Sequence, residues 1–275
     1  MLKLRVITGV TLALLVVAGA LTLDQRQLAV LATAVALLAA WEWTRLAGLV
    51  QPAARAAGLA AVAAAHGLLW WPGVAPSGAV LLPLVAVFWV AFATWLVAGG
   101  RPRSGVGGVR WRWLVAGLVL LPAFSLGLLT VAAAPPGRGL LLYALFLVFV
   151  ADTGAYFSGR RFGRRKLAPA VSGGKTWEGL FGGLVCVAAF TVVAAWLLEV
   201  PPARWPLWVG IGLLAGALSV AGDLFISVLK REAGAKDSGR LLPGHGGLLD
   251  RMDSLLAAVP VQAVGFGLVL GTGGP

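Results

Sequence analysis

The chain has 275 residues, of which 60% are hydrophobic and only 12% are charged, and it carries a formal net charge of +12. Repeated apolar runs of about 20 residues, the length that crosses a hydrocarbon layer of about 30 Å, exclude an ordinary soluble domain and indicate a membrane protein with many spans. The one cysteine, Cys186, lies in an apolar run, which excludes a disulfide framework and a cysteine metal site.

Nine apolar runs predict nine transmembrane helices in a single membrane domain over residues 1–275, so the expected fold class is an all-α polytopic integral membrane protein. The first run follows two basic residues, as in a signal peptide, but no clear cleavage signal follows, which favours a first transmembrane helix. Small-residue spacings at Gly179/Gly183 and Gly212/Gly216 indicate close helix packing. The predicted spans cover residues 5–22, 28–45, 56–71, 79–98, 112–132, 139–158, 178–198, 206–229 and 254–271.

The basic residues are unevenly divided between the two sides of this predicted topology. The N-terminus and the even-numbered loops carry 19 of the 22 Lys and Arg residues, whereas the odd-numbered loops carry only Arg26, Arg138 and Arg204. Because cytoplasmic loops are enriched in Lys and Arg, we expect a cytoplasmic N-terminus and an outer C-terminus. Topology thus explains much of the positive charge, and we expect no nucleic-acid partner. A basic cytoplasmic face also attracts anionic lipid and nucleotide.

The two halves of the chain differ in their acidic residues. Residues 1–140 contain only Asp24 and Glu42, whereas residues 141–275 contain the other eight acids, of which only Glu199 lies on the predicted outer side. We therefore expect scaffold and lipid-contact helices in residues 1–140, and catalytic helices with cytoplasmic loops in residues 141–275. Interfacial anchoring is the expected role of six tryptophans near span ends. They are Trp41, Trp43, Trp70, Trp71, Trp111 and Trp113.

Asp152 is the first acid of the second half and stands late in the sixth predicted span. An acid at the end of an apolar run is costly to bury and usually has a partner. Two interpretations stay open: an interfacial ion pair with Arg160 or Arg161, or a functional role in a polar cavity.

Residues 172–178, Ser-Gly-Gly-Lys-Thr-Trp-Glu, look at first like a phosphate-binding loop. They do not match the P-loop pattern, because position 169 is Pro rather than Gly and no strand is predicted before them. Accessible N–H groups of small residues, the charge of Lys175 and the start of the seventh span nevertheless suit an anion. The alternative is a basic loop in which Ser172 or Thr176 caps the helix.

Three further acids define a candidate metal site. Asp223 lies among apolar residues about two helical turns before the end of the eighth span, so it needs a cation, either Lys230 or Arg231 or a metal ion. Asp250 and Asp253 are three residues apart, which places them on one helix face. Together the three carboxylates suit Mg²⁺ when phosphates complete its coordination. Alternatively, Asp250 and Asp253 form an acidic first turn that complements the helix dipole.

The segment 227–253 is the most charged part of the chain, with nine charged residues among 27. Its glycines and Pro243 disfavour a long helix and predict a polar, turn-rich loop. His245 has no second His or Cys nearby, which argues against zinc. Carboxylates, cations and glycine-rich turns at the predicted cytoplasmic face favour metal-assisted phosphoryl or nucleotidyl transfer on a lipid. The charged residues are Lys230, Arg231, Glu232, Lys236, Asp237, Arg240, Asp250, Arg251 and Asp253.

The pattern of this segment resembles the signature of the phosphatidate cytidylyltransferase (CDP-diacylglycerol synthase) family. It reads Ser227-x-x-Lys230-Arg231-x4-Lys236-Asp237-x-Gly239-x2-Leu242-Pro243-x-His245-Gly246-Gly247-x2-Asp250-Arg251-x-Asp253. The stretches 152–156, 172–179 and 222–225 resemble that family as well, so the resemblance covers about residues 140–255. One departure is Ile226, where the family often has Glu, which bears on a minor polar contact and not on the class.

The resemblance implies transfer of the cytidylyl group of CTP to phosphatidate, giving CDP-diacylglycerol and pyrophosphate in phospholipid biosynthesis. It implies Mg²⁺ as cofactor, with a second cation left open, and a multi-pass protein of the inner, cytoplasmic membrane whose site faces the cytoplasm. A lipid phosphate oxygen is already anionic near neutral pH, so charge neutralisation and alignment matter more than a general base.

The resemblance also assigns roles to residues of this sequence. The expected metal ligands are Asp223 and Asp250, with Asp253 as a further candidate. The expected catalytic residues are Asp223, Asp250, Lys175, Lys236 and Asp237. The expected substrate-binding residues are Ser172, Thr176, Lys230, Arg231, His245, Arg251 and Asp152.

Two alternative functions stay open. A CTP-dependent polyprenol or phytol kinase also uses CTP at a membrane but cleaves the bond between its β- and γ-phosphates, and we do not expect the full 227–253 pattern there. An ion-coupled transporter with Asp152 and Asp223 as ion sites predicts acids near the bilayer midplane and a pathway open to both sides, whereas these acids cluster with cations on one face. CTP, phosphatidate and membrane lipid are the expected partners, and a homodimer is compatible with the sequence but not specified by it.

Overall fold

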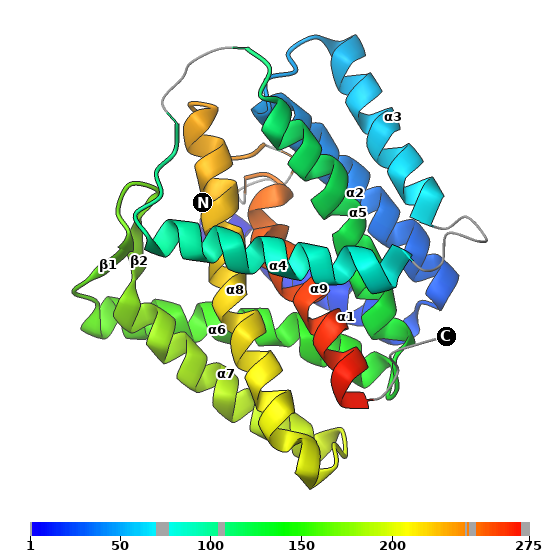
Figure 1. Cartoon of the computed structure of the whole chain (residues 1–275), viewed down its shortest axis with the longest axis vertical. Helices are drawn as coiled ribbons and strands as arrows, with labels where there is room; N and C mark the ends of the chain where they lie inside the picture. Colours follow the sequence, from blue (N-terminus) through cyan, green and yellow to red (C-terminus); the bar gives the residue numbers. More distant parts are fainter. Residues whose placement is uncertain (1, 70–76, 104–107, 240, 242–245, 271–275) are drawn as a thin grey trace.

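Nine helices make up nearly all of the regular structure in this computed structural model, which describes residues 2–69, 77–103, 108–239, 241 and 246–270 (Figure 1). Each helix coincides with one of the nine predicted spans, so the predicted all-α polytopic fold is confirmed. Eight helices are long and apolar enough to cross a membrane, and the apolar part of the first, Gly9–Thr22, is shorter within the described residues. The helices are α1 (Leu2–Thr22), α2 (Gln25–Leu46), α3 (Pro52–Leu69), α4 (Ser77–Val97), α5 (Trp111–Ala133), α6 (Arg138–Phe162), α7 (Trp177–Leu197), α8 (Trp205–Glu232) and α9 (Leu249–Leu270).

A short hairpin between α6 and α7 was not predicted. Strand β1 (Lys166–Ala168) pairs antiparallel with β2 (Ser172–Thr176), with Lys166 opposite Thr176 and Ala168 opposite Ser172. The expectation that no strand precedes residue 172 is therefore wrong. Glycines and lysines are poor strand formers, so the sequence carries little sign of a pairing made locally by the backbone. A 3₁₀ turn (Pro202–Arg204) leads into α8.

Helices α8 and α9 lie in the middle of the molecule, with α2, α3 and α5 on one side and α6 and α7 on the other (Figure 1). The two helices approach each other closely where a Cβ on Gly222 would overlap the carbonyl oxygen of Asp253. This close approach brings the acid-bearing turns of both helices together.

Glycines on α7 allow equally close packing against α6. A Cβ on Gly183 would lie 2.7 Å from the carbonyl oxygen of Ala151, and one on Gly179 would lie 2.9 Å from that of Ala155. On α8, a Cβ on Gly212 would lie 2.6 Å from Oγ1 of Thr191. The packing role predicted from the small-residue spacings is thus confirmed.

An aromatic cluster anchors α8 two residues beyond Asp223. The ring of Phe225 lies 4.9 Å from that of Trp113, 5.1 Å from that of Trp89 and 6.0 Å from that of Trp43. Interfacial anchoring is therefore wrong for Trp43 and Trp113, which are buried.

The indole N–H groups of these two residues explain why they point inward. The indole N–H of Trp43 donates to the Trp113 carbonyl (2.7 Å), and that of Trp113 donates to Oε2 of Glu232 (2.7 Å). Both acceptors lie inside the protein, so both indoles are buried. Trp41 and Trp111 are exposed, as anchoring requires, and Trp70 and Trp71 lie outside the described residues.

We expect Gly183→Ala to lower the free energy of unfolding by about 1–3 kcal/mol, because the added methyl group forces α6 and α7 apart. Gly210→Ala is the matched control, since a Cβ at this α8 position meets no atom within 4 Å. Thermal unfolding in mild detergent measures both. Equal melting temperatures for the two variants would contradict the close packing of α6 against α7.

Candidate active site

The acid of α8 is paired with the lysine of the hairpin. Nζ of Lys175 on β2 lies 2.6 Å from Oδ2 of Asp223, and Oγ of Ser227, one turn further along α8, donates to Oδ1 of Asp223 (3.3 Å). The sequence predicts Lys230 or Arg231 as the protein cation for Asp223, whereas the cation in the structure is Lys175. The hairpin places Lys175 next to Asp223 and so brings the segment 172–178 close to the acid of α8.

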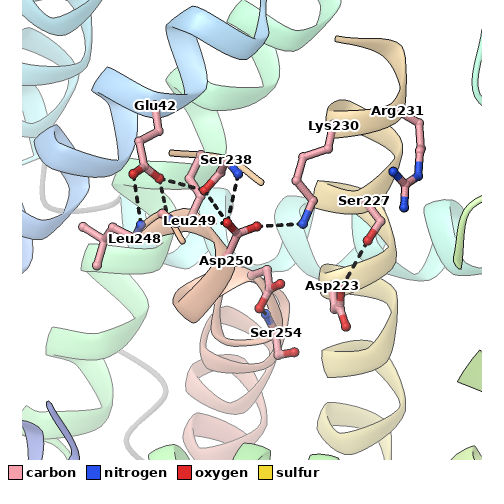
Figure 2. A network of polar contacts seen from close by, with 12 residues as sticks. Glu42, Asp223, Ser227, Lys230, Arg231, Ser238, Leu248, Leu249, Asp250 and Ser254 are labelled. Carbon is pink, nitrogen blue, oxygen red and sulfur yellow. Dashed lines mark hydrogen bonds and ion pairs between the residues drawn. The ribbon is translucent and has the colours of Figure 1, made fainter. Parts of the chain in front are cut away.

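Asp250, at the start of α9, is the centre of a polar network (Figure 2). Its Oδ1 atom accepts from Nζ of Lys230 (2.7 Å). Its Oδ2 atom accepts from the backbone N–H of Ser238 (2.9 Å), from Oγ of Ser238 (3.0 Å) and from the backbone N–H of Gly247 (3.1 Å). The two ends of the segment 227–253 belong to α8 and α9, and residues 233–248 between them are called the charged loop. Asp250 therefore ties α8, the charged loop and α9 together.

Asp253 belongs to a different group of charges from Asp250. It lies close enough to Asp223, Lys175 and Asp152 for their charges to act on it, and Asp152 in turn interacts with Lys175 and Asp223. Three carboxylates from three helices thus lie within electrostatic reach of Lys175, and Asp223 is the one that forms an ion pair with it among the described residues. Asp152 forms no ion pair with Arg160 or Arg161 in the described part of the chain, which favours the second of its two interpretations.

An apolar cavity of about 450 Å³ ends at these acids. Helices α1, α2, α5 and α6 line most of it with aliphatic and aromatic side chains, among them Val16, Leu31, Phe124 and Leu145. Its polar end is formed by α6 and α9, and the side chains there are Asp152, Asp250, Arg251, Asp253 and Ser254.

The remaining predicted site residues divide by location. Thr176 is the N-cap of α7, where its Oγ1 accepts from the N–H of Gly179 (3.1 Å), and Ser172 is half-buried on β2. Arg231 donates from Nε to the Val171 carbonyl (3.5 Å). Lys236, Asp237 and Arg251 are exposed, and His245 lies outside the described residues.

Three residues of the network were missed by the sequence analysis. Glu42 and Arg45 come from α2, in the half predicted to be scaffold, and Ser238 lies in the charged loop. Oγ of Ser238 lies 2.8 Å from Oε2 of Glu42, and Nη2 of Arg45 donates to the Ser238 carbonyl (2.6 Å). The one available signal was the isolation of Glu42 as an acid inside an apolar span.

The carboxylates of the site can hold a hard divalent cation only if a substrate supplies further ligands. Among the described residues, no three His, Cys, Asp or Glu side chains are close enough to form a metal site by themselves. Mg²⁺ usually takes one or two protein carboxylates and completes its coordination with phosphate oxygens and water. Asp223 and Asp253, whose charges interact, fit that pattern.

Fold and site together define a polytopic membrane protein in which carboxylates and cations gather at one end of an apolar cavity. A sequence model of the cytidylyltransferase family matches residues 3–268. A phosphatidate cytidylyltransferase of Pseudomonas aeruginosa is 45% identical over 265 residues, 96% of each chain. Another, of Haemophilus influenzae, is 38% identical over 294 residues, covering 98% of this chain and 100% of the relative. The chain belongs to the cytidylyltransferase family, and the resemblance found in the sequence is confirmed.

We expect Lys230→Met to destabilise the protein by about 3 kcal/mol or more, because it leaves the Asp250 carboxylate buried without its cation. The side chain of Asp250 is only 8% exposed. Arg231→Met is the matched control on the next residue, whose exposed side chain contributes about 1 kcal/mol or less. Thermal unfolding in detergent compares the variants, and equal losses would show that the ion pair does not stabilise the loop.

Proposed function

We propose that this chain transfers the cytidylyl group of CTP to phosphatidate, giving CDP-diacylglycerol and pyrophosphate. The observation that carries the proposal is the apolar cavity that ends at Asp152, Asp250, Arg251 and Asp253, next to the Lys175–Asp223 pair. Such a site suits a substrate with an apolar tail and an anionic head. Membership of the cytidylyltransferase family supports the same reaction, as does the activity for which the two bacterial relatives are named.

The cavity suits part of the lipid substrate. Its volume lies in the range of small-molecule pockets, and its apolar walls offer few hydrogen-bond partners to a nucleoside triphosphate. An acyl chain in the cavity places the lipid phosphate at the polar end, beside Arg251. CTP then approaches from the side of the charged loop and hairpin, where Lys175, Lys230 and Lys236 lie.

The reaction is an in-line displacement at phosphorus. An anionic oxygen of the lipid phosphate forms a bond to the α-phosphorus of CTP, and the bond between that phosphorus and the bridging oxygen to the β-phosphate breaks. The electron pair of that bond leaves with pyrophosphate. No proton needs to be removed from the attacking oxygen, so a site without a histidine base is adequate.

The residues of the site supply alignment and charge. Mg²⁺, bound through Asp223 and Asp253, would neutralise charge on the phosphates and on the leaving pyrophosphate. Lys175 and Lys230, which hold Asp223 and Asp250, stand where they can also contact phosphate oxygens. Asp250 keeps the role of a predicted metal ligand, while its hydrogen bonds from the loop favour a role in holding that loop.

Two further features belong to the proposal. The bacterial relatives favour the inner membrane. The uneven distribution of Lys and Arg between the loops favours a site that faces the cytoplasm, where CTP is made. The kinase alternative shares the substrate CTP and differs in the bond that is cleaved, so product analysis separates the two.

Purified wild-type protein with Mg²⁺, CTP and phosphatidate is expected to release pyrophosphate and form CDP-lipid. We expect Asp223→Asn to lower turnover about 100-fold or more, because it removes one charge from the metal and phosphate site. Glu199→Gln, an equivalent change at an exposed acid after α7, should keep wild-type turnover. Full activity in Asp223→Asn, or no wild-type turnover in suitable lipid, would overturn the proposal.

We expect Leu31→Trp, which fills part of the cavity, to raise the KM for phosphatidate by about tenfold while leaving the KM for CTP unchanged. Leu31 lines the cavity and is 46% exposed, so a larger side chain is tolerated there. Val30→Trp is the control, since Val30 is 71% exposed on the same helix and does not line the cavity. Equal lipid KM values for the two variants would place the lipid elsewhere.

A further inference from the structure

Glu42 is a buried acid in the half of the chain that carries almost no charge. Its side chain is only 4% exposed, and its neighbours Ala39, Ala40 and Trp43 are buried as well. No ion pair of Glu42 is found within the described residues. A buried carboxylate without a cation persists only where several hydrogen-bond donors are directed at it.

Those donors come from the charged loop and the start of α9, about 200 residues away in sequence (Figure 2). Oε1 of Glu42 accepts from the backbone N–H of Leu248 (3.1 Å). Oε2 accepts from the backbone N–H of Leu249 (3.0 Å) and lies 2.8 Å from Oγ of Ser238. Both carboxylate oxygens are therefore occupied.

Helix α9 needs an acceptor at this position because it has no side-chain cap of its own. The Leu248 carbonyl accepts from the N–H groups of Arg251 (2.9 Å) and Met252 (3.2 Å), which makes Leu248 the N-cap residue. The side chain of leucine cannot accept a hydrogen bond, whereas the side chain of Ser, Thr, Asp or Asn usually does so at an N-cap. Glu42 supplies the missing acceptor from α2, and its charge is favourable at the positive end of the helix dipole.

The backbone of the charged loop lies very close to the Glu42 carboxylate. A Cβ on Gly239 would overlap Oε1 of Glu42, and a Cβ on Gly247 would overlap Oε2. Glycine at both positions lets the backbone approach the acid closely. The glycines of the signature segment are thus matched to an acid that lies outside it.

Ser238 links Glu42 to the candidate active site. Its Oγ lies between Oε2 of Glu42 and Oδ2 of Asp250, and its backbone N–H donates to the same Asp250 atom. Arg45, one turn further along α2, holds the Ser238 carbonyl from the other side. A shift of Glu42 is therefore transmitted to Asp250 through one residue and to Asp253 through the first turn of α9.

We propose that Glu42 is a positioning residue for the transfer reaction, which caps α9 from α2 and, through Ser238, sets the placement of Asp250 and Asp253. This inference rests on the proposed function for its kinetic consequence. Its structural part, the cap on α9, is independent of the reaction. Glu42 does not contact the cavity or the Lys175–Asp223 pair, so it is not a catalytic residue.

The test compares Glu42→Gln with Asp24→Asn, two acid-to-amide changes on the same helix. Asp24 caps α2 itself, with its Oδ1 accepting from the N–H of Gln27 (2.8 Å), and has no part in the loop. Gln has the size of Glu, but its NH₂ group would face a backbone N–H. We expect Glu42→Gln to lower kcat about tenfold or more, with the KM for CTP nearly unchanged, because misplaced groups act mainly in the transition state.

Hydrogen exchange supplies a readout that does not depend on turnover. The amides at the start of α9 should exchange faster in Glu42→Gln than in wild type, and at the wild-type rate in Asp24→Asn. Ser238→Ala, which removes only the hydroxyl bridge, should lower kcat while the amides of Leu248 and Leu249 keep their hydrogen bonds to Glu42 and exchange at the wild-type rate.

Unchanged kcat in Glu42→Gln, or unchanged exchange at the start of α9, would overturn the inference. A wild-type protein that makes no CDP-lipid would defeat the proposed function, while the exchange comparison would still test the cap.

Discussion

A carboxylate within a membrane-spanning helix needs hydrogen-bond donors or a cation, and this requirement organises the whole second half of the chain. Asp223 on α8 takes Lys175 from the hairpin, and Asp250 on α9 takes Lys230 from α8. Each pair joins two separate elements of the chain. The polar groups needed for chemistry on phosphates are therefore also the groups that hold the helix ends in place.

The division into a scaffold half and a catalytic half stays a prediction, and the structure shows that the two halves meet at the site. Glu42 and Arg45 of α2 bind Ser238, and the aromatic rings of Trp43, Trp89 and Trp113 pack around Phe225. Helices of the first half, which carry few charges, thus hold the charged loop and α8 in place. The apolar cavity uses the same helices, so the first half contributes the surface that suits a lipid tail.

The sequence predicted the helices well because the thickness of the bilayer sets the length of each apolar run. It predicted the charged segment because the composition of that segment departs sharply from the rest of the chain. It did not predict the partners. Asp223 was assigned Lys230 or Arg231 by proximity in sequence, whereas the hairpin delivers Lys175 from residues far away. Glu42 was visible only as an isolated acid, since its donors are backbone N–H groups, which no sequence pattern displays. Long-range pairing of this kind depends on how the helices pack, and small-residue spacings indicate that a helix face packs closely without naming the helix that packs against it.

The bond that is cleaved in CTP tests the central claim most directly. Purified protein in phosphatidate-containing vesicles with Mg²⁺ can be supplied with CTP labelled at either the α- or the γ-phosphorus. The account predicts that the α-label enters the lipid and the γ-label is released as pyrophosphate. Transfer of the γ-label to the lipid, with the α-label left in CDP, would contradict it and identify a kinase.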